Sequence, residues 1–280
     1  MAGGDAERQA AEVARYLSTG EHDMWFPAWT GSNTVDRLQR GTRDLQKALI
    51  AELQRRVAAV ATTVAMPAAL RELDGIGFVR RKAEAMVRGL FPQAEQDIVL
   101  SCVERAVMFL TPETIATVVM DCDWLSTAWD VGNIYLASMH AEPLGADGPQ
   151  LVGLCDNQRC YVSVQYFAET DPYADFVVHE IAHIFHNCLR RDMGLPETRG
   201  RKYPLAIHYS KRETFAYACE AYARIIERAS SAAERQALAR DFAGFGEGDS
   251  RVDPSEVAAI VRDACARRYG WAHIRDACRE

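Results

Sequence analysis

The sequence predicts an α+β protein, with a mainly helical region at residues 1–120 and a region of one small antiparallel or mixed sheet and further helices at residues 121–280. Apolar residues recur at helical spacing in the first third of the chain. Strand-forming residues are concentrated between positions 133 and 167, and helical spacing returns after position 170. Because the strands do not alternate with helices, a βαβ arrangement is disfavoured.

The helical period is clearest in residues 34–60, where Asn33 or Thr34 can cap the first turn. Residues 94–110 predict a second helix, and Pro112 predicts the first turn of a third. The apolar positions of the first of these helices are Val35, Leu38, Leu45, Leu49, Leu53, Val57 and Val60.

The sheet is expected in the middle of the chain. Residues 133–138 have the composition of a strand, and residues 141–149 are rich in the Gly, Pro and Asp of loops. Residues 151–154 and 160–167 predict a hairpin. A last helix is predicted from Asp253, where Asp-Pro-Ser-Glu forms a capping pattern.

Composition limits the class of protein. The 280-residue chain has a net charge of −7, with 49% hydrophobic and 25% charged residues, which excludes disordered, collagen-like and disulfide-dense chains. No long Lys/Arg run is present, so nucleic acid is not an expected partner. The first residues lack a secretory signal, and the most apolar stretch, residues 57–70, is too short for a membrane span. We therefore expect a soluble, cytoplasmic protein without a membrane partner.

Eight cysteines are scattered without CxxC pairs, and free thiols are expected in the cytoplasm. Cys155 and Cys160 differ from the others because they face each other across the turn of the predicted hairpin. The sequence leaves open whether they form a disulfide, bind a metal or are ordinary hairpin residues.

The segment His-Glu-Ile-Ala-His at residues 179–183 matches the pattern H-E-x-x-H. On a helix, His179 and His183 lie on one face, so that both imidazoles can bind one Zn²⁺ ion, with Glu180 beside it as general base. Residues 170–172 predict the start of this helix, and Gly194 with the following proline predicts its end. The alternative is a core helix with two hydrogen-bonded histidines.

A third zinc ligand must come from another element, and residues 209–222 predict a second helix that can supply it. Glu213 and Glu220 share a face of this helix but are separated by about 10 Å along its axis, so only one is expected to reach the metal. Ser210 and Glu213 also fit a capping box, which explains Glu213 without a metal. Glu220 is an alternative ligand, a partner of a ligand histidine, or a solvated residue.

Two further histidines lie close to these segments. His186 follows His183 by one helical turn and is an alternative ligand, or a buried residue that supports a ligand. His208 precedes Tyr209, and it either donates a hydrogen bond during catalysis or packs on the surface.

These motifs resemble those of gluzincins, the zinc metallopeptidases with H-E-x-x-H on one helix and a glutamate ligand on a following helix. The segment Glu-Thr-Phe-Ala-Tyr-Ala from Glu213 is similar to the E-x-F-A-x-A pattern of lethal-factor-like catalytic domains. The resemblance covers residues 161–227, about a quarter of the chain. It implies a zincin-like fold, with Glu213 as third ligand and Tyr209 as the residue that faces the scissile carbonyl.

The expected function is zinc-dependent hydrolysis of a peptide bond. Zinc lowers the pKa of its bound water and polarises the substrate carbonyl, and Glu180 takes the proton of that water and delivers it to the leaving amine. Tyr209 or His208 donates to the oxyanion, and Glu220 orients a ligand histidine. Residues 160–167 are the candidate edge strand for an extended substrate. The expected partner is a peptide or protein substrate.

Three other functions fit the same residues. One is hydrolysis of a small amide or modified peptide in a biosynthetic or regulatory pathway. Another is the function of a regulatory protein of the ImmA/IrrE type, which cuts one transcriptional repressor. Proteins of that type resemble this chain in their H-E-x-x-H motif and downstream Glu. The third is a non-catalytic scaffold with structural zinc. The helical residues 1–120 can cover the cleft, bind a partner protein or complete the core.

Overall fold

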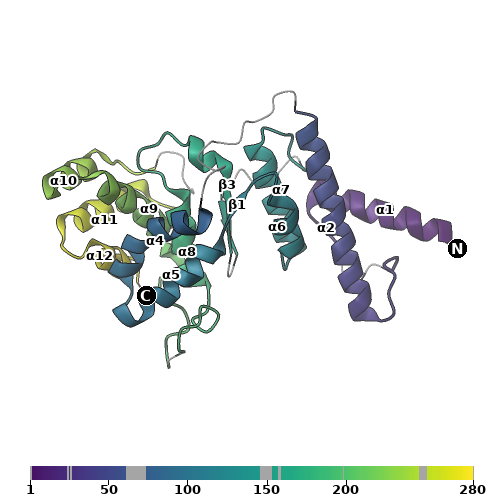
Figure 1. Ribbon diagram of the computed structural model, residues 1–280, viewed down its shortest axis with the longest axis horizontal. Helices are drawn as coiled ribbons and strands as arrows, with labels where there is room; N and C mark the ends of the chain where they lie inside the picture. The colour runs from purple at the N-terminus through teal and green to yellow at the C-terminus, as the bar shows by residue number, and fades with distance from the viewer. Residues whose placement is uncertain are drawn as a thin grey trace. The chain divides into compact units, whose positions relative to one another are not determined.

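The computed structural model is an α+β structure, about 65% helical with one small sheet, which confirms the predicted class (Figure 1). It describes residues 2–23, 25, 27–60, 74–145, 153–156, 159–197, 199–245 and 251–279. The chain divides into two compact units. Unit 1 comprises Met1–Pro67, Phe109–Val152 and Ser163–Gln165, and unit 2 comprises Ala68–Met108, Gly153–Val162 and Tyr166–Glu280. The boundary expected near residue 120 stays a prediction.

Within the described part of unit 1, helix α2 packs against α1, α6 and α7 (Figure 1). Asn33 caps α2 as predicted, because its side chain accepts a hydrogen bond from the backbone of Asp36. Leu45, Leu49 and Leu53 are buried in this core at the predicted helical spacing. The helices are α1 (Ala2–Thr19), α2 (Thr34–Ala58), α6 (Ile115–Asp121) and α7 (Leu125–Ser138).

The strand predicted at residues 133–138 is wrong, because these residues form the end of α7. Ten of the fourteen residues of this helix are buried, so its sequence lacks the polar face that marks a surface helix. A short apolar run with Ile134 and Tyr135 has the same appearance in a buried helix and in a strand.

Two neighbouring predictions are wrong at their boundaries. The helix predicted at residues 94–110 ends at Ala106 and continues as strand β1 (Val107–Leu110). Helix α6 begins at Ile115 and not at Pro112, because the hydroxyl of Thr111 accepts from the two backbone N–H groups that precede α6 and holds this stretch as a turn.

The three strands have the spatial order β1-β3-β2. The hairpin of β2 (Gly153–Cys155) and β3 (Cys160–Ser163) is antiparallel and pairs Cys155 with Cys160. Two predictions are thereby corrected: β3 is central and not at the edge, and a 3₁₀ helix (Val164–Ala168) replaces the second half of the strand expected at residues 160–167. Residues 151–152 of the expected hairpin, 146–149 of the expected loop and 61–70 of the apolar stretch lie outside the described residues.

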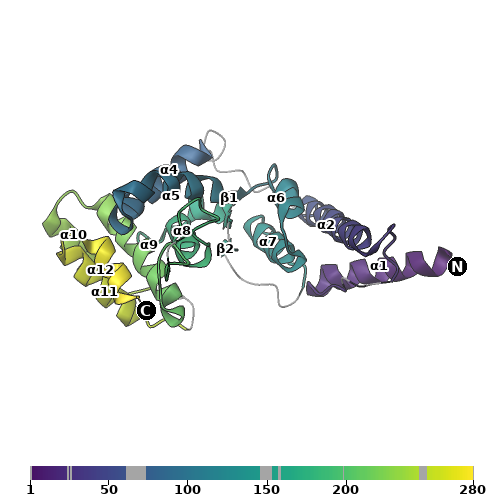
Figure 2. The ribbon, with the colours of Figure 1, turned by 90° about the horizontal axis from the view of Figure 1, so that it is seen from below.

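Unit 2 contains the remaining helices. Helix α9 packs against α8 and also against α11 and α12, so that it lies between them (Figure 2). Helix α4 packs against α5 and α8. The helices are α4 (Gly75–Leu90), α5 (Gln93–Ala106), α8 (Phe176–Asn187), α9 (Arg212–Arg228), α10 (Ala232–Asp241), α11 (Pro254–Ala266) and α12 (Gly270–Ala277), with a 3₁₀ turn, η2 (Tyr209–Lys211), before α9.

The caps of two helices decide their limits. Helix α8 starts after Asp175, whose side chain accepts a hydrogen bond from the backbone N–H of Val178. The start predicted at residues 170–172 is therefore wrong. The helix ends at Asn187, before the end predicted at Gly194. Helix α11 starts with Pro254 after the cap Asp253, as predicted.

Candidate metal centre

Helix α8 brings His179 and His183 together. The two residues are one turn apart, and their Nε2 atoms are 3.1 Å from each other. The opposite face of the helix is apolar and fully buried, which fixes its rotation in the core. The buried apolar residues are Val177, Val178, Ile181, Ala182, Ile184 and Phe185. Burial of one face therefore directs both imidazoles to the same point.

Glu213, in the first turn of α9, completes a group of three potential ligands. Its Oε2 atom lies 3.4 Å from Nε2 of His183 and 3.7 Å from Nε2 of His179. The predicted capping box with Ser210 does not form, because α9 begins after Lys211 without a side-chain cap. The structure thus brings together the three residues that the motifs single out as ligands.

The separations suit a tetrahedral zinc site. Two ligands about 2.05 Å from a tetrahedral ion are about 3.3 Å apart, and the three separations of 3.1, 3.4 and 3.7 Å bracket this value. Two imidazole nitrogens and one carboxylate oxygen are also a donor set that zinc accepts in catalytic sites. The residues present therefore fit the ion.

The charges of the group are strongly coupled. Burial disfavours the charged form of His179, but the neighbouring carboxylates of Glu213 and Glu220 outweigh burial and raise its pKa to about 10. Burial likewise opposes ionisation of Glu213, but the imidazoles of His179 and His183, 3.7 and 3.4 Å from its carboxylate, hold its pKa well below the usual value. An anionic carboxylate therefore faces the two imidazoles.

Glu220 supports His179 from the other side of the ring. Its Oε2 atom is 3.0 Å from Nδ1 of His179, and its Oε1 atom accepts from the backbone N–H of Asp175 at 2.7 Å. The side chain is buried, and burial raises its pKa while the charge of His179 opposes this. Since Glu220 bonds Nδ1, Nε2 is the nitrogen of His179 that can bind a metal once it releases its proton.

His186 contacts the Nδ1 side of His183, as Glu220 contacts the Nδ1 side of His179. Its Nε2 atom lies 3.2 Å from Nδ1 of His183, and its own Nδ1 lies 3.2 Å from the amide oxygen of Asn187. Burial, followed by repulsion from His183, lowers its pKa to about 3, so the ring is neutral. A neutral ring that donates to Asn187 must accept from His183, which leaves Nε2 of His183 free for a metal. His186 therefore bonds one of the three converging residues, and its role as the support of a ligand stays a prediction.

Glu180 lies between the two histidines in the sequence. Its side chain is buried, with 7% of the residue's surface exposed. Burial raises the pKa of its carboxyl, and the charges of His179 and His183 oppose this rise. Strand β2 runs directly over its carboxylate, because a Cβ atom at Gly153 would overlap Oε1 of Glu180. Only glycine lets the strand approach the carboxylate this closely.

His208 and Tyr209 lie in and before the 3₁₀ turn η2 that precedes α9. The ring of His208 hydrogen-bonds the hydroxyl of Ser210 at 2.9 Å, and both residues are exposed. Tyr209 is 76% exposed, and its ring contacts the guanidinium of Arg212. Their predicted roles as oxyanion donors stay predictions.

Sequence reasoning missed the aromatic side of the centre. The ring of Tyr217 lies edge-on to His179 with 4.6 Å between centroids, and Phe245 stacks against Tyr217. Tyr217 follows Glu213 by four residues, so helical spacing could have placed it on the same face. Lys82 was also missed: its Nζ atom lies 2.9 Å from the cap Asp175, linking α4 to the start of α8.

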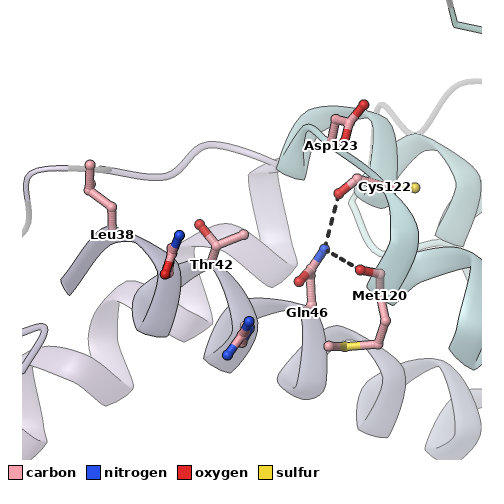
Figure 3. A pocket seen from close by; sticks show the side chains of 8 residues that line it. Leu38, Thr42, Gln46, Met120, Cys122 and Asp123 are labelled. Carbon is pink, nitrogen blue, oxygen red and sulfur yellow. Dashed lines mark hydrogen bonds between the residues drawn. The ribbon is translucent and has the colours of Figure 1, made fainter. Parts of the chain in front are cut away.

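A shallow pocket of about 460 Å³ occurs in unit 1, lined by residues of α2, α6 and the turn that follows α6 (Figure 3). The amide of Gln46 donates there to the carbonyl groups of Met120 and Cys122. This bonding satisfies the end of α6, so the side chain of Gln46 has a structural role.

Comparison with known protein families, curated proteins and solved structures finds no match for this chain. Among the described residues, no helix combines the length and the apolar character needed to cross a membrane.

Proposed function

We propose that the chain is a zinc-dependent hydrolase that cleaves a peptide (amide) bond, with the zincin-like arrangement of a gluzincin. The observation that carries the proposal is the convergence of His179 Nε2, His183 Nε2 and Glu213 Oε2 within 4.8 Å of one another. Both histidines use their other nitrogen for a buried partner, which is how ligand histidines are oriented in metal sites.

In this proposal His179, His183 and Glu213 hold the zinc ion. When bound, zinc makes water more acidic and polarises the carbonyl of the scissile bond. Glu180 takes the proton from the attacking water and delivers it to the leaving amine. The raised pKa that burial gives Glu180 suits a group that both accepts and releases a proton. Tyr209 and His208 are the candidate donors to the oxyanion.

The edge strand gives the substrate a binding mode. Strand β2 is last in the order β1-β3-β2, and its Gly153 lies against the carboxylate of Glu180. An extended peptide that pairs with β2 would bring a backbone carbonyl close to the general base. This strand replaces β3 as the proposed docking element.

The test is a digest of a broad peptide library by the zinc-loaded chain and its Glu180→Gln variant. We expect the variant to keep one zinc per chain and to lose hydrolysis by about 10²–10⁴-fold, the usual contribution of a general base. Glu227→Gln on α9 is the control, since its carboxylate bonds Lys82 and Arg224. Equal rates for wild type and Glu180→Gln overturn the proposal. Zinc binding without any cleavage favours the scaffold alternative, and cleavage of only a few sequences favours a dedicated hydrolase.

A further inference from the structure

A second group of potential ligands lies on the β2–β3 hairpin. One atom each of Cys155, Cys160 and Glu180 lies within 4.8 Å of the other two. The two Sγ atoms are 3.0 Å apart, and both thiols are free in the structure. This group shares Glu180 with the proposed mechanism but none of the three residues that would hold the catalytic zinc.

The hairpin holds the two thiols side by side. The backbone N–H of Asp156 donates to the carbonyl of Arg159 at 2.9 Å, and the carboxylate of Asp156 accepts from the N–H of Arg159 at 2.9 Å. Since hydrogen-bonded and non-hydrogen-bonded pairs alternate, the next pair, Cys155 and Cys160, is non-hydrogen-bonded, where facing side chains are closest. The register therefore brings both sulfurs to one face of the hairpin.

The spacing and the donor types are those of a zinc site. Two cysteines separated by four residues fall within the spacing common for zinc ligands, and thiolates select zinc among the abundant divalent cations. Two sulfurs about 2.3 Å from a tetrahedral zinc are about 3.8 Å apart, so the pair must open by about 0.8 Å. Two thiolates and a carboxylate carry three negative charges against the two positive charges of the ion.

Burial makes the group a defined site. Cys160 is fully buried and Glu180 is 7% exposed, whereas Cys155 is partly exposed and gives the ion access from solvent. The thiol of Cys160 donates to the backbone carbonyl of Glu180 at 3.1 Å, which ties β3 to α8 at the position of the general base. One carboxylate oxygen of Glu180 already lies within 4.8 Å of both sulfur atoms.

We propose that Cys155, Cys160 and Glu180 bind a second Zn²⁺ ion, and that its binding inhibits the hydrolase by occupying the general base. The binding site itself is independent of the proposed function, whereas the inhibition rests on it. A carboxylate that coordinates an ion shares its negative charge with that ion and is therefore a weaker base, so it accepts a proton from water less readily. Zinc in excess of the amount that fills the first site would thereby inhibit the enzyme.

The binding is tested with Co²⁺, whose bond to a thiolate gives a charge-transfer absorption in the near ultraviolet. A His179→Ala/His183→Ala chain removes the first site and should bind one Co²⁺ with this absorption. Adding Cys155→Ser and Cys160→Ser should abolish the absorption, whereas adding Cys102→Ser, a half-buried thiol of α5, should not. Absence of the band from the histidine variant, or its persistence in the cysteine variant, overturns the proposal.

A measurement on the unmodified chain covers the case in which the variants do not fold. Zn²⁺ in excess of one equivalent should slow alkylation of Cys155 by iodoacetamide at least tenfold, followed by mass spectrometry of that peptide. Equal rates with and without the second equivalent contradict the site. A Cys155–Cys160 disulfide that forms equally fast with and without zinc identifies a redox pair instead and also overturns the proposal.

The inhibition is tested in the full chain. A second equivalent of Zn²⁺ should lower peptide hydrolysis at least tenfold in wild type, and the ratio of the rates at one and two equivalents should stay near one in Cys155→Ser/Cys160→Ser. Hydrolysis that is insensitive to the second zinc overturns the inhibition. If the thiolate absorption appears but no peptide is cleaved at any zinc level, the hydrolase proposal fails and the second site stands.

Discussion

The Nδ1 atom of His179 lies 3.0 Å from Oε2 of Glu220, while the Nε2 atom of the same ring faces Oε2 of Glu213 at 3.7 Å. One imidazole therefore lies between two glutamates of α9 that are seven residues apart. Only the Nε2 side also faces His183, so we expect the two glutamates to differ in role: Glu213 is the proposed third ligand, and Glu220 is the proposed partner that orients His179.

In a Cys155→Ser/Cys160→Ser background, which removes the second proposed site, Glu213→Ala should abolish zinc binding, whereas Glu220→Gln should keep one zinc per chain and bind it about 10–100-fold more weakly. The glutamine keeps the size of Glu220 but presents an N–H₂ group to one of its two donors, Asp175 N–H or His179 Nδ1–H. Competition with a chelator measures both affinities, and Glu227→Gln on the same helix serves as control. Zinc loss in Glu220→Gln together with retention in Glu213→Ala would exchange the two roles.

The sequence could place His179, Glu180 and His183 on one helix because four-residue spacing is a local property of that helix. It could not decide between Glu213 and Glu220, because both lie on the same face of α9 and differ in the atoms of α8 that they meet. Those contacts are set by packing of α8 on α9, two segments more than twenty residues apart. The same packing of α8 on α9 determines which residue contacts each nitrogen of His179.

The features of the structure that the sequence did not reveal also depend on contacts between distant segments. Residues 133–138 are buried on nearly every side, so the polar positions that reveal a helix are missing. The start of α8 was placed too early because Pro172 is a common first-turn residue, but Asp175 caps the helix and bonds Lys82 from another helix. Tyr217 was missed because the ring it contacts, His179, belongs to a different segment.

Asp175→Ala should destabilise unit 2 by about 2–3 kcal/mol. The loss of the cap of α8 costs about 1 kcal/mol, and Lys82, with 13% of its side chain exposed, loses one of its two carboxylates. Asp175→Asn keeps an oxygen for the cap and should cost less. Urea unfolding of the three metal-free proteins, followed by circular dichroism, gives the free energies; equal stability of wild type and Asp175→Ala contradicts the prediction.

Glu52 of α2 makes the stability of unit 1 depend on acid. Hydrogen bonding from Arg55, and then from Arg56, outweighs burial and lowers the pKa of Glu52 to about 2. A pKa lowered in the folded state adds stability that is complete above the unfolded value near 4.5 and is lost as the pH falls toward 2. The difference in unfolding free energy between wild type and Glu52→Gln should therefore be constant, at about 1 kcal/mol, above pH 5 and shrink below it.

The same difference should decrease in high salt, because Arg55 is largely exposed. Unfolding by urea at a series of pH values measures it, and an Arg55→Gln/Arg56→Gln background is the control in which the pH dependence should disappear. A difference that grows as the pH falls would have the wrong sign for a carboxylate stabilised by arginines.

Gly153→Ala separates catalysis from metal binding. The new Cβ atom would overlap Oε1 of Glu180, so either β2 or the carboxylate must shift. Because the carboxylate is the terminal group of a flexible side chain, we expect it to move, and a general base that is displaced by about 1 Å costs on the order of 100-fold in rate. At one equivalent of zinc the zinc content should not change, since the three atoms nearest to the new Cβ all belong to Glu180 and none to the three proposed ligands. Gly75→Ala on α4 is the matched control because its Cβ meets no atom within 4 Å. Measurement of kcat and bound zinc in both variants is decisive: a fully active Gly153→Ala chain would mean that Glu180 does not act from the position in which β2 holds it.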